Sequence, residues 1–202
     1  TTLDTNSING FTLLQSAALK NDVEAIHLLI DTGIDINKAT DDAGCTPVFI
    51  AAHQNSKESL QLLIQAGADI NKATKDGATP AFIAAQQNSK EALQLLIQAG
   101  ADINKATKDG ATPAYIATQQ NSKEALQLLI QAGADINKAK NDGATPVYIA
   151  AQNNRHEALQ LLIQAKADIN KANKEGATPA YIAAEDNSKE SLQLLIQAKA
   201  DI

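Results

Sequence analysis

Aromatic residues, cysteine and arginine are scarce in this chain, and each shortage narrows what it can be. Only 3% of its 202 residues are aromatic and none is tryptophan, so Ala, Leu and Ile must fill the core. Cys45 is the only cysteine, which excludes an internal disulfide framework and favours a reducing, cytoplasmic location.

Charge and hydropathy argue against two further classes of partner. The net charge is −6 and Arg155 is the only arginine, whereas nucleic-acid binding needs a concentrated basic surface. No run approaches 18 apolar residues, so we expect no membrane span. The start, Thr1-Thr2-Leu3-Asp4, has no signal-peptide pattern.

What the chain does have is a phrase repeated at a fixed interval. Asp76-Gly77-Ala78-Thr79-Pro80 returns with its glycine at positions 110 and 143. A further copy has its glycine at 176, with Glu175 in place of the aspartate. A looser copy, Gly44-Cys45-Thr46-Pro47, stands earlier, so the glycines step by 33 residues each time. Such self-similarity predicts stacked supersecondary units that bury a continuous core between neighbours.

One unit, residues 74–106, can be interpreted physically. Gly77 suits a turn, Thr79 an N-cap and Pro80 the first position of a short helix. We expect Asn88 to cap a second helix with Glu91 as its capping-box partner. An apolar stripe follows and Gly100 ends the helix, after which the chain runs extended into the next turn; the stripe consists of Ala92, Leu93, Leu95, Leu96 and Ile97.

This pattern resembles the ankyrin repeat: Gly77-Ala78-Thr79-Pro80 opens the unit, a Leu-rich helix follows, and Gly100-Ala101-Asp102-Ile103-Asn104 closes it. The resemblance implies an all-α, right-handed solenoid of about six helix-turn-helix repeats with extended loop or β-turn fingers. We place an N-terminal tail at residues 1–8 and the repeat domain at 9–202. The predicted repeats are 9–39, 40–73, 74–106, 107–139, 140–172 and 173–202.

Several positions depart from the family pattern. The usual His after Thr-Pro-x is replaced by an aromatic residue, which we expect to stack between repeats, with tyrosine hydroxyls reaching a loop; these residues are Phe49, Phe82, Tyr115, Tyr148 and Tyr181. The first unit, with a polar Lys20-Asn21-Asp22 turn, is expected to be an N-terminal cap. Lys166 and Lys199 replace the helix-ending glycine and should adopt left-handed geometry. Because the last unit looks internal, we expect the natural protein to continue, with exposed apolar surface near Leu192 and Leu195.

Catalytic and cofactor chemistry finds little support. His27, His53 and His156 lie in different repeats, so no metal site is predicted. Each turn has a single glycine, which does not make a phosphate loop. Cys45 is expected to be a simple surface thiol. Asp69 and its equivalents one period apart are interpreted as turn acids, and the chain as non-enzymatic, with no cofactor and no small-molecule substrate.

The polar positions that end the short helices, with the adjacent finger tips, are the candidate partner-binding residues, because ankyrin-like modules usually place them on a concave face. They are Gln54, Lys75, Asp76, Gln86, Gln87, Lys108, Asp109, Gln119, Gln120, Asp142, Gln152, Asn153, Glu185 and Asp186. A second amide column is expected on the convex side, where it only adds solubility: Gln61, Gln94, Gln127, Gln160 and Gln193. The resemblance also raises Asn71, Asn104, Asn137 and Asn170 as hydroxylation targets, although a turn-closing role is favoured.

The predicted function is therefore a non-catalytic scaffold that binds a folded protein partner. The near-identity of residues 74–106 and 107–139 suggests recent duplication, which fits a bacterial effector acting in a host cytosol or an engineered array. Two alternatives remain open. The repeats could recruit substrates to a catalytic domain absent from this chain, or they could be a structural spacer with no specific partner.

Overall fold

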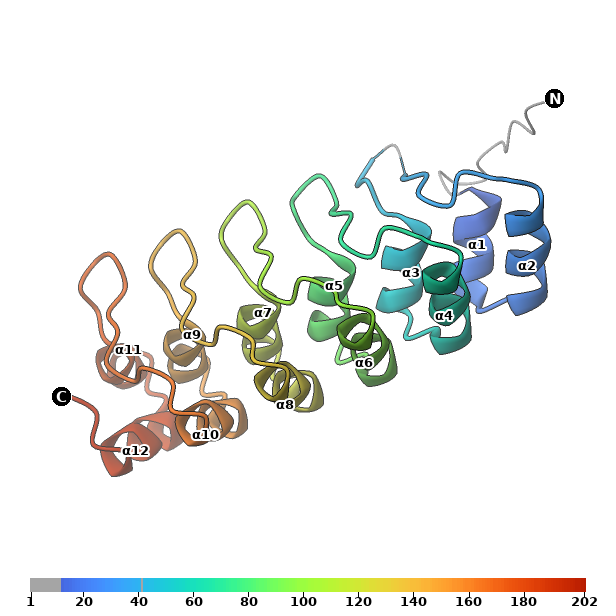
Figure 1. Ribbon diagram of the computed structural model, residues 1–202. Helices are drawn as coiled ribbons and strands as arrows, with labels where there is room; N and C mark the ends of the chain where they lie inside the picture. The colour runs from blue at the N-terminus through green and yellow to red at the C-terminus, as the bar shows by residue number, and fades with distance from the viewer. Residues whose placement is uncertain (1–11, 41) are drawn as a thin grey trace. The chain divides into compact units, whose positions relative to one another are not determined.

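The computed structural model describes residues 12–40 and 42–202, and these residues form twelve α-helices and no strand (Figure 1). The predicted all-α class is confirmed. The predicted tail at residues 1–8 lies outside the described part of the chain. In order, the helices are α1 (Leu13–Lys20), α2 (Val23–Asp31), α3 (Pro47–His53), α4 (Lys57–Gln65), α5 (Pro80–Gln86), α6 (Lys90–Gln98), α7 (Pro113–Gln119), α8 (Lys123–Gln131), α9 (Pro146–Gln152), α10 (His156–Gln164), α11 (Pro179–Glu185) and α12 (Lys189–Gln197).

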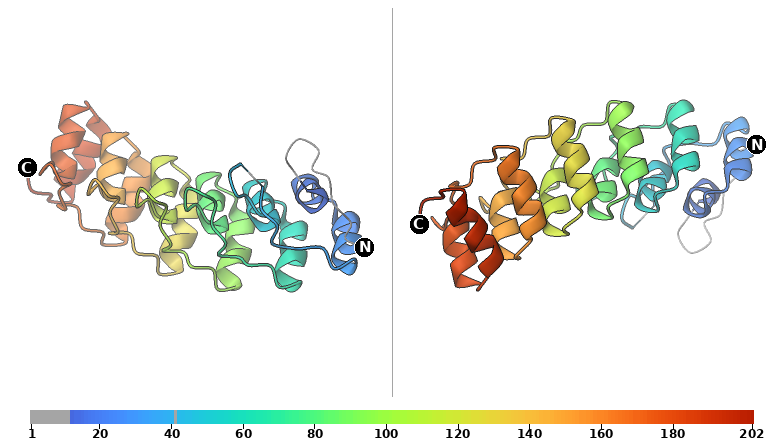
Figure 2. Two further views of the ribbon diagram at one scale, coloured as in Figure 1. Left: turned by 90° about the horizontal axis from the view of Figure 1, so that it is seen from above. Right: turned by 90° about the horizontal axis from the view of Figure 1, so that it is seen from below.

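The helices divide between two compact units. The first comprises the described residues up to 84 together with 89–102, and the second comprises 85–88 and 103–202. In the first unit α1 packs on α3, α2 on α4, and α4 on α6. In the second, α7 and α11 pack against α9, while α8 and α12 pack against α10. Within each unit the odd-numbered helices therefore form one row and the even-numbered helices another (Figure 2).

The short helices α3, α5, α7, α9 and α11 begin as the sequence predicts, with threonine at the N-cap and proline at the first position. Thr46 Oγ1 accepts from the Phe49 N–H at 3.2 Å, and Thr145 Oγ1 accepts from the Tyr148 N–H at 3.1 Å. The cap satisfies an amide that has no partner within the helix, and proline loses nothing at a position whose N–H is unpaired.

The longer helices begin differently from the prediction. The N-cap of α6 is Ser89, one residue after the predicted Asn88, and its side chain makes no capping hydrogen bond. Asn88 has φ 54° and turns its side chain to the following repeat instead: Oδ1 accepts from the Ala125 N–H at 2.9 Å and Nδ2 donates to Glu124 Oε2 at 2.6 Å. Glu91 likewise accepts from Asn55 of the preceding repeat. The capping box is thus wrong, because the asparagine caps the next repeat's helix.

We call Asn21, Asn55, Asn88, Asn121, Asn154 and Asn187 the turn asparagines; all have φ between 51° and 58°. Four of them make this pair of bonds: Asn21 to residues 58 and 59, Asn55 to 91 and 92, Asn88 to 124 and 125, and Asn154 to 190 and 191. Each bond pair ties the start of one longer helix to the repeat before it.

Asn121 breaks the rule. Its Oδ1 is buried and has no hydrogen-bond partner, and Glu157, the acid that it should meet, pairs instead with Lys123 at 3.5 Å. At this junction Arg155 and His156 stand where the others have Ser and Lys. Arg155 Nε donates to the Gln119 carbonyl at 3.2 Å, the role that Ser122 Oγ has toward Gln86.

In the first described repeat, α2 is capped from within. Asp22 Oδ1 accepts from the Ala25 N–H at 3.0 Å, the amide that a turn asparagine would otherwise reach. A capping box also starts α1, where Thr12 and Gln15 exchange hydrogen bonds. Both helix starts are thus satisfied within the repeat. The repeat also exposes Leu13, Leu19 and Leu28, and its role as an N-terminal cap stays a prediction.

The core consists of small and aliphatic side chains. Most alanines of the short helices are buried, and α4, α6, α8 and α10 each bury a leucine pair completely, for example Leu93 and Leu96. The expectation of exposed apolar surface near Leu192 and Leu195 is wrong in detail: Leu195 is fully buried because it faces the short-helix row, and Leu192 is half-buried. The exposed large hydrophobic residues of this last repeat are Tyr181 (58%), Ile196 (50%) and Ile202 (95%).

The closing segments of the repeats follow the sequence prediction in part: the left-handed lysines and the turn-closing aspartates are as predicted, but the run expected to be extended contains a turn at 103–104, and the turn-closing role expected of the asparagine column is wrong. Lys166 and Lys199 are left-handed, with φ 61° and 63°, where Gly133 has φ 80°. Asp69 Oδ1 accepts from the Asn71 N–H at 2.9 Å, and Asn71 Oδ1 accepts from the Asp102 N–H of the next repeat at 2.8 Å. The aspartate column therefore closes turns, and the asparagine column joins repeats.

Candidate functional site

The loops between repeats are built by backbone hydrogen bonds rather than by side-chain packing. We call residues 74–78, 107–111, 140–144 and 173–177 the finger loops. In each, the first N–H donates to the carbonyl four residues later, as from Lys140 to Ala144 at 3.0 Å. The glycine N–H then donates back to the first carbonyl, as from Gly143 to Lys140 at 2.9 Å. The two bonds hold each finger loop in one tight turn.

Neighbouring finger loops are also bonded to one another within the second unit. The Asn141 N–H donates to the Asp109 carbonyl at 2.9 Å, and the Lys174 N–H donates to the Asp142 carbonyl at 3.0 Å. Glycine is required for this approach: a Cβ on Gly143, at φ 89°, would lie 2.6 Å from the Lys174 nitrogen. These backbone hydrogen bonds therefore brace neighbouring finger loops against one another.

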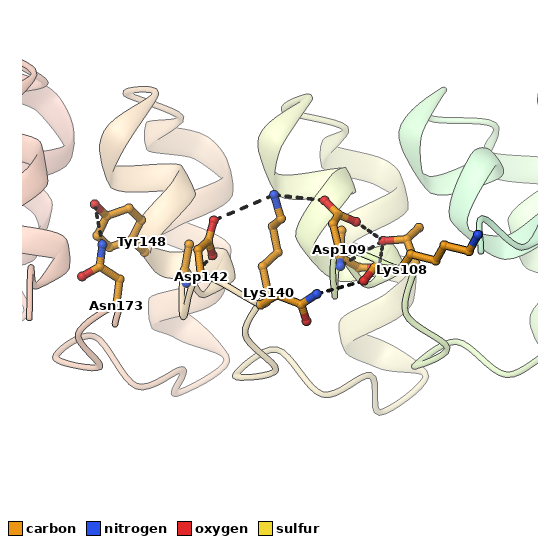
Figure 3. Close-up of polar contacts among 10 residues, drawn as sticks. Lys108, Asp109, Lys140, Asp142, Tyr148 and Asn173 are labelled. Carbon is orange, nitrogen blue, oxygen red and sulfur yellow. Dashed lines mark hydrogen bonds and ion pairs between the residues drawn. The ribbon is translucent and has the colours of Figure 1, made fainter. Parts of the chain in front are cut away.

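Lys140 is the centre of a polar cluster on these loops (Figure 3). Its Nζ lies 3.1 Å from Asp109 Oδ2, 3.9 Å from Asp142 Oδ2, and 5.5 Å from the centroid of the Tyr115 ring. Asp109 also accepts a hydrogen bond from the Thr107 hydroxyl. That bond, followed by the nearby Lys140 ammonium, lowers the pKa of the Asp109 carboxyl. The cluster is an ammonium held by an aromatic face and two carboxylates.

The three tyrosines, one per repeat, are not equivalent. Tyr115 and Tyr148 are 3% and 7% exposed, whereas Tyr181 is 58% exposed. Tyr148 Oη accepts from Asn173 Nδ2 at 3.3 Å, so the hydroxyl meets a loop side chain rather than a carbonyl. Burial raises the pKa of both Tyr115 and Tyr148, with further contributions from nearby carboxylates. The expected aromatic column is therefore buried at 115 and 148, and open at 181.

An open cleft of about 480 Å³ lies where α9, α11 and the last finger loop meet. Tyr148 and Tyr181 line it, together with the carboxylates of Glu175 and Glu185 and the amide of Gln152. Neither of these glutamates forms an ion pair within the described residues. The cleft therefore combines aromatic rings with uncompensated negative charge, and we call it the tyrosine–glutamate cleft.

The predicted partner-binding residues fall on the loops and on the ends of the short helices. Gln86, Gln119 and Gln152 are half-buried, and their carbonyls accept hydrogen bonds from the following repeat. The rest are exposed: Gln54, Lys75, Asp76, Gln87, Lys108, Asp109, Gln120, Asp142, Asn153, Glu185 and Asp186. We call the exposed and the half-buried residues together the polar edge.

The structure brings some of the polar edge together and adds residues that the sequence did not select. Asp109 and Asp142 meet around Lys140, and Gln152 and Glu185 meet in the tyrosine–glutamate cleft. Lys140, Tyr148 and Tyr181 were missed as site residues. The signal that could have found Lys140 is its place at the head of a finger loop, where the next loop has Asn173.

The opposite row of helices offers a second, shallower hollow. The predicted convex amides are all exposed, as expected. Between α10 and α12, His156, Gln160, Glu190 and Gln193 line a depression of about 270 Å³. Leu194 and Gln197 complete its lining, and no tyrosine lines it. It is smaller than the tyrosine–glutamate cleft, so it offers less contact area for an anchor residue.

Metal and membrane sites were also sought. Within residues 12–40 and 42–202, no group of three or more His, Cys, Asp or Glu side chains could hold a metal ion. No helix in this part of the chain has the length and apolarity to cross a membrane. Cys45 is half-buried rather than a simple surface thiol, and burial raises its pKa, which disfavours a reactive thiolate.

Comparison with known proteins agrees with this geometry. A family profile for ankyrin repeats (3 copies) matches residues 2–74, 71–140 and 132–202. The crystal structure of an ankyrin repeat domain from Acinetobacter baumannii AYE superposes with a TM-score of 0.82 at 29% identity, covering 93% of this chain and 98% of that one. A search of curated proteins gives no significant match. Ankyrin repeats are generally protein-interaction modules and are typically non-catalytic. The chain belongs to the ankyrin-repeat family.

Proposed function

We propose that this chain is a non-catalytic scaffold that binds a folded protein through the polar edge. One observation carries the proposal: the polar edge varies between repeats where packing does not require it. Helix ends change from Gln119-Gln120 through Gln152-Asn153 to Glu185-Asp186, while the buried leucine pairs stay the same. The following repeat uses only the main-chain carbonyls of these helix ends, so their side chains are available to a partner.

The bracing of the loops supports the same proposal. A surface whose backbone is already fixed by hydrogen bonds loses little conformational entropy on binding. The remaining entropy cost is that of ordering the side chains, which are mostly amides and carboxylates. Such a surface suits a folded partner with hydrogen-bonding groups opposite the glutamines and basic groups opposite Glu185 and Asp186, where charge sets association rate and salt dependence.

The test compares two triple variants with equal charge change. Gln87→Arg, Gln120→Arg and Asn153→Arg alter the polar edge; Gln94→Arg, Gln127→Arg and Gln160→Arg alter exposed amides on the other row. Proximity labelling should show partners that the control variant and the unmodified chain share and that the polar-edge variant loses. Circular dichroism should show equal helicity in all three. Loss of the same partners only in the control variant would place the site on the longer helices and overturn the proposal.

We further propose that this interaction takes place in a cytosol, as part of a bacterial effector that acts on host proteins. The single cysteine, the near-identical repeats at 74–106 and 107–139, and the similarity to a bacterial domain support this assignment. A translocation reporter fused to the full-length protein, assayed in infected host cells, should report host-cytosolic signal; signal confined to the bacteria would contradict it.

A further inference from the structure

We propose that the tyrosine–glutamate cleft binds a lysine side chain of the partner protein. The inference rests on the proposed function and names the chemistry of one part of that surface. It comes from a comparison between neighbouring repeats of the chain itself: one repeat holds a lysine against a tyrosine and two carboxylates, and the cleft offers tyrosines and carboxylates with no lysine.

The filled site is the cluster around Lys140. Its ammonium is paired with Asp109 at 3.1 Å and Asp142 at 3.9 Å (Figure 3). It also lies 5.5 Å from the centroid of the Tyr115 ring. The lysine side chain is only 22% exposed. An ammonium between an aromatic face and carboxylates is stabilised both by the ring quadrupole and by charge.

One period later the same positions hold Tyr148, Asp142 and Glu175, but the lysine is replaced by Asn173. Asn173 cannot supply the charge, since its side chain is a neutral amide. It is also committed to the loop: Oδ1 accepts from the N–H groups of Glu175 and Ala177, and Nδ2 donates to Tyr148. The aromatic and acidic parts of the lysine site are thus present without their lysine.

Asn173 itself fills the place equivalent to that of Lys140, and Tyr148 is only 7% exposed, so a cation from outside must bind beside that place, in the tyrosine–glutamate cleft. Tyr181 exposes 58% of its surface and faces the same cleft as Glu175 and Glu185. Lys174, the nearest lysine in sequence, does not line the cleft. The volume of the cleft, about 480 Å³, falls within the range of protein ligand pockets. It leaves room for the alkyl stem of a lysine beside the rings of Tyr148 and Tyr181.

The experiment titrates the full chain with a blocked lysine, N-acetyl-lysine methylamide, and follows backbone amide NMR signals. The signals of Gly176, Ala177 and Tyr181 should shift until the site is saturated. Added salt should weaken the binding, because it screens the attraction between the ammonium and the carboxylates. The same compound acetylated on its side chain, and blocked norleucine, should shift them little. Equal shifts with norleucine would show apolar adsorption, and tighter binding of blocked arginine would assign the cleft to guanidinium; either result overturns the proposal, as does the absence of any saturable shift.

Variants supply the second arm. The double variant Glu175→Gln, Glu185→Gln should bind the blocked lysine about fivefold more weakly, or weaker still. The control variant, Glu157→Gln, changes an exposed glutamate of α10 and should bind it as the unmodified chain does. Asn173→Lys should place an internal ammonium over Tyr148 and also exclude the probe. The loop tolerates lysine there, because Lys140 heads the preceding finger loop. If the Asn173→Lys chain, shown folded by its amide spectrum, binds the probe as before, the cleft is not the site.

This test is independent of the one for the proposed function. The blocked lysine needs no protein partner, so the cleft can fail as a lysine site while the polar edge still proves to bind a partner. Conversely, lysine binding with unchanged partner labelling in the polar-edge variant would refute the proposed function alone.

Discussion

Asn154 and Glu190 are joined across two repeats: Asn154 Nδ2 donates to Glu190 Oε2 at 2.6 Å, while its Oδ1 accepts from the Ser191 N–H at 3.0 Å. Asn121, one period earlier, has the same left-handed backbone but neither bond, and its Oδ1 is buried without a partner. The pair provides a natural comparison between a junction that is capped across repeats and one that is not.

We therefore expect Asn154→Ala to destabilise the chain more than Asn121→Ala. Both changes lose a residue that tolerates left-handed geometry, which costs roughly 1 kcal/mol. Only Asn154→Ala also leaves the Ser191 N–H uncapped, which adds about 1 kcal/mol. Urea denaturation of the two variants measures the difference. Equal losses of stability would show that the bonds across the junction contribute nothing.

The same junction gives a pH dependence. The Asn154 amide, followed by a backbone hydrogen bond, lowers the pKa of Glu190 in the folded chain. The ionised form therefore favours folding above the unfolded pKa of about 4.3, and this contribution is lost as pH falls through the lowered folded value. The stability gap between the unmodified chain and Asn154→Ala should narrow on acidification below about pH 4. A gap that widens in acid would contradict the assigned direction.

Gly143 and Gly176 separate two costs of replacing a loop glycine. Both have positive φ, 89° and 84°, but a Cβ on Gly143 would meet the Lys174 nitrogen at 2.6 Å, whereas one on Gly176 meets nothing within 4 Å. Gly176→Ala should cost about 1 kcal/mol from backbone strain alone. Gly143→Ala should cost a further 1–3 kcal/mol or so, because the backbone of the next loop must shift. Thermal and chemical denaturation of both variants test the order, and a larger cost at Gly176 would refute it.

Lys166 ends α10 with φ 61°, in a place where Gly133 ends α8 with φ 80°. Lys166→Gly should stabilise the chain by about 0.5–1 kcal/mol, since glycine adopts this geometry without Cβ strain. The reciprocal change, Gly133→Lys, should destabilise it by a similar amount, because no atom lies within 4 Å of a Cβ there and only the backbone term changes. Comparing the denaturation midpoints of both variants with that of the unmodified chain tests these two predictions. A lower midpoint for Lys166→Gly would contradict the strain argument.

The repeat period, the short-helix starts and the helix-ending residues could all be predicted from sequence because they depend on local backbone chemistry. Thr145 and Pro146 define a helix start wherever they stand, and Lys166 inherits its geometry from the glycines at its position. The turn asparagines were misassigned as local caps, since sequence shows an Asn before a helix but not which helix its side chain reaches.

The site was less accessible to sequence for the same reason. The exposed residues of the polar edge follow from their repeat position, but the cluster around Lys140 depends on how closely two finger loops approach. Tyr148 and Tyr181 look identical in sequence and differ in structure, because the finger loop headed by Asn173 covers only the first. Their difference is a property of neighbours, which a single repeat does not encode.

The side-chain bonds that join repeats span only 25 to 41 residues of sequence. A loss of residues 140–172 would connect Ala139 to Asn173 and remove one period of 33 residues; Asp109 and Tyr115 would exchange Lys140 for Asn173, and the asparagines that join repeats would keep equivalent partners. Asn121 would then face Glu190 and Ser191, the partners that Asn154 has now. Gain or loss of a whole repeat is therefore a mild genetic change in this chain, and the number of repeats can evolve faster than the repeat itself.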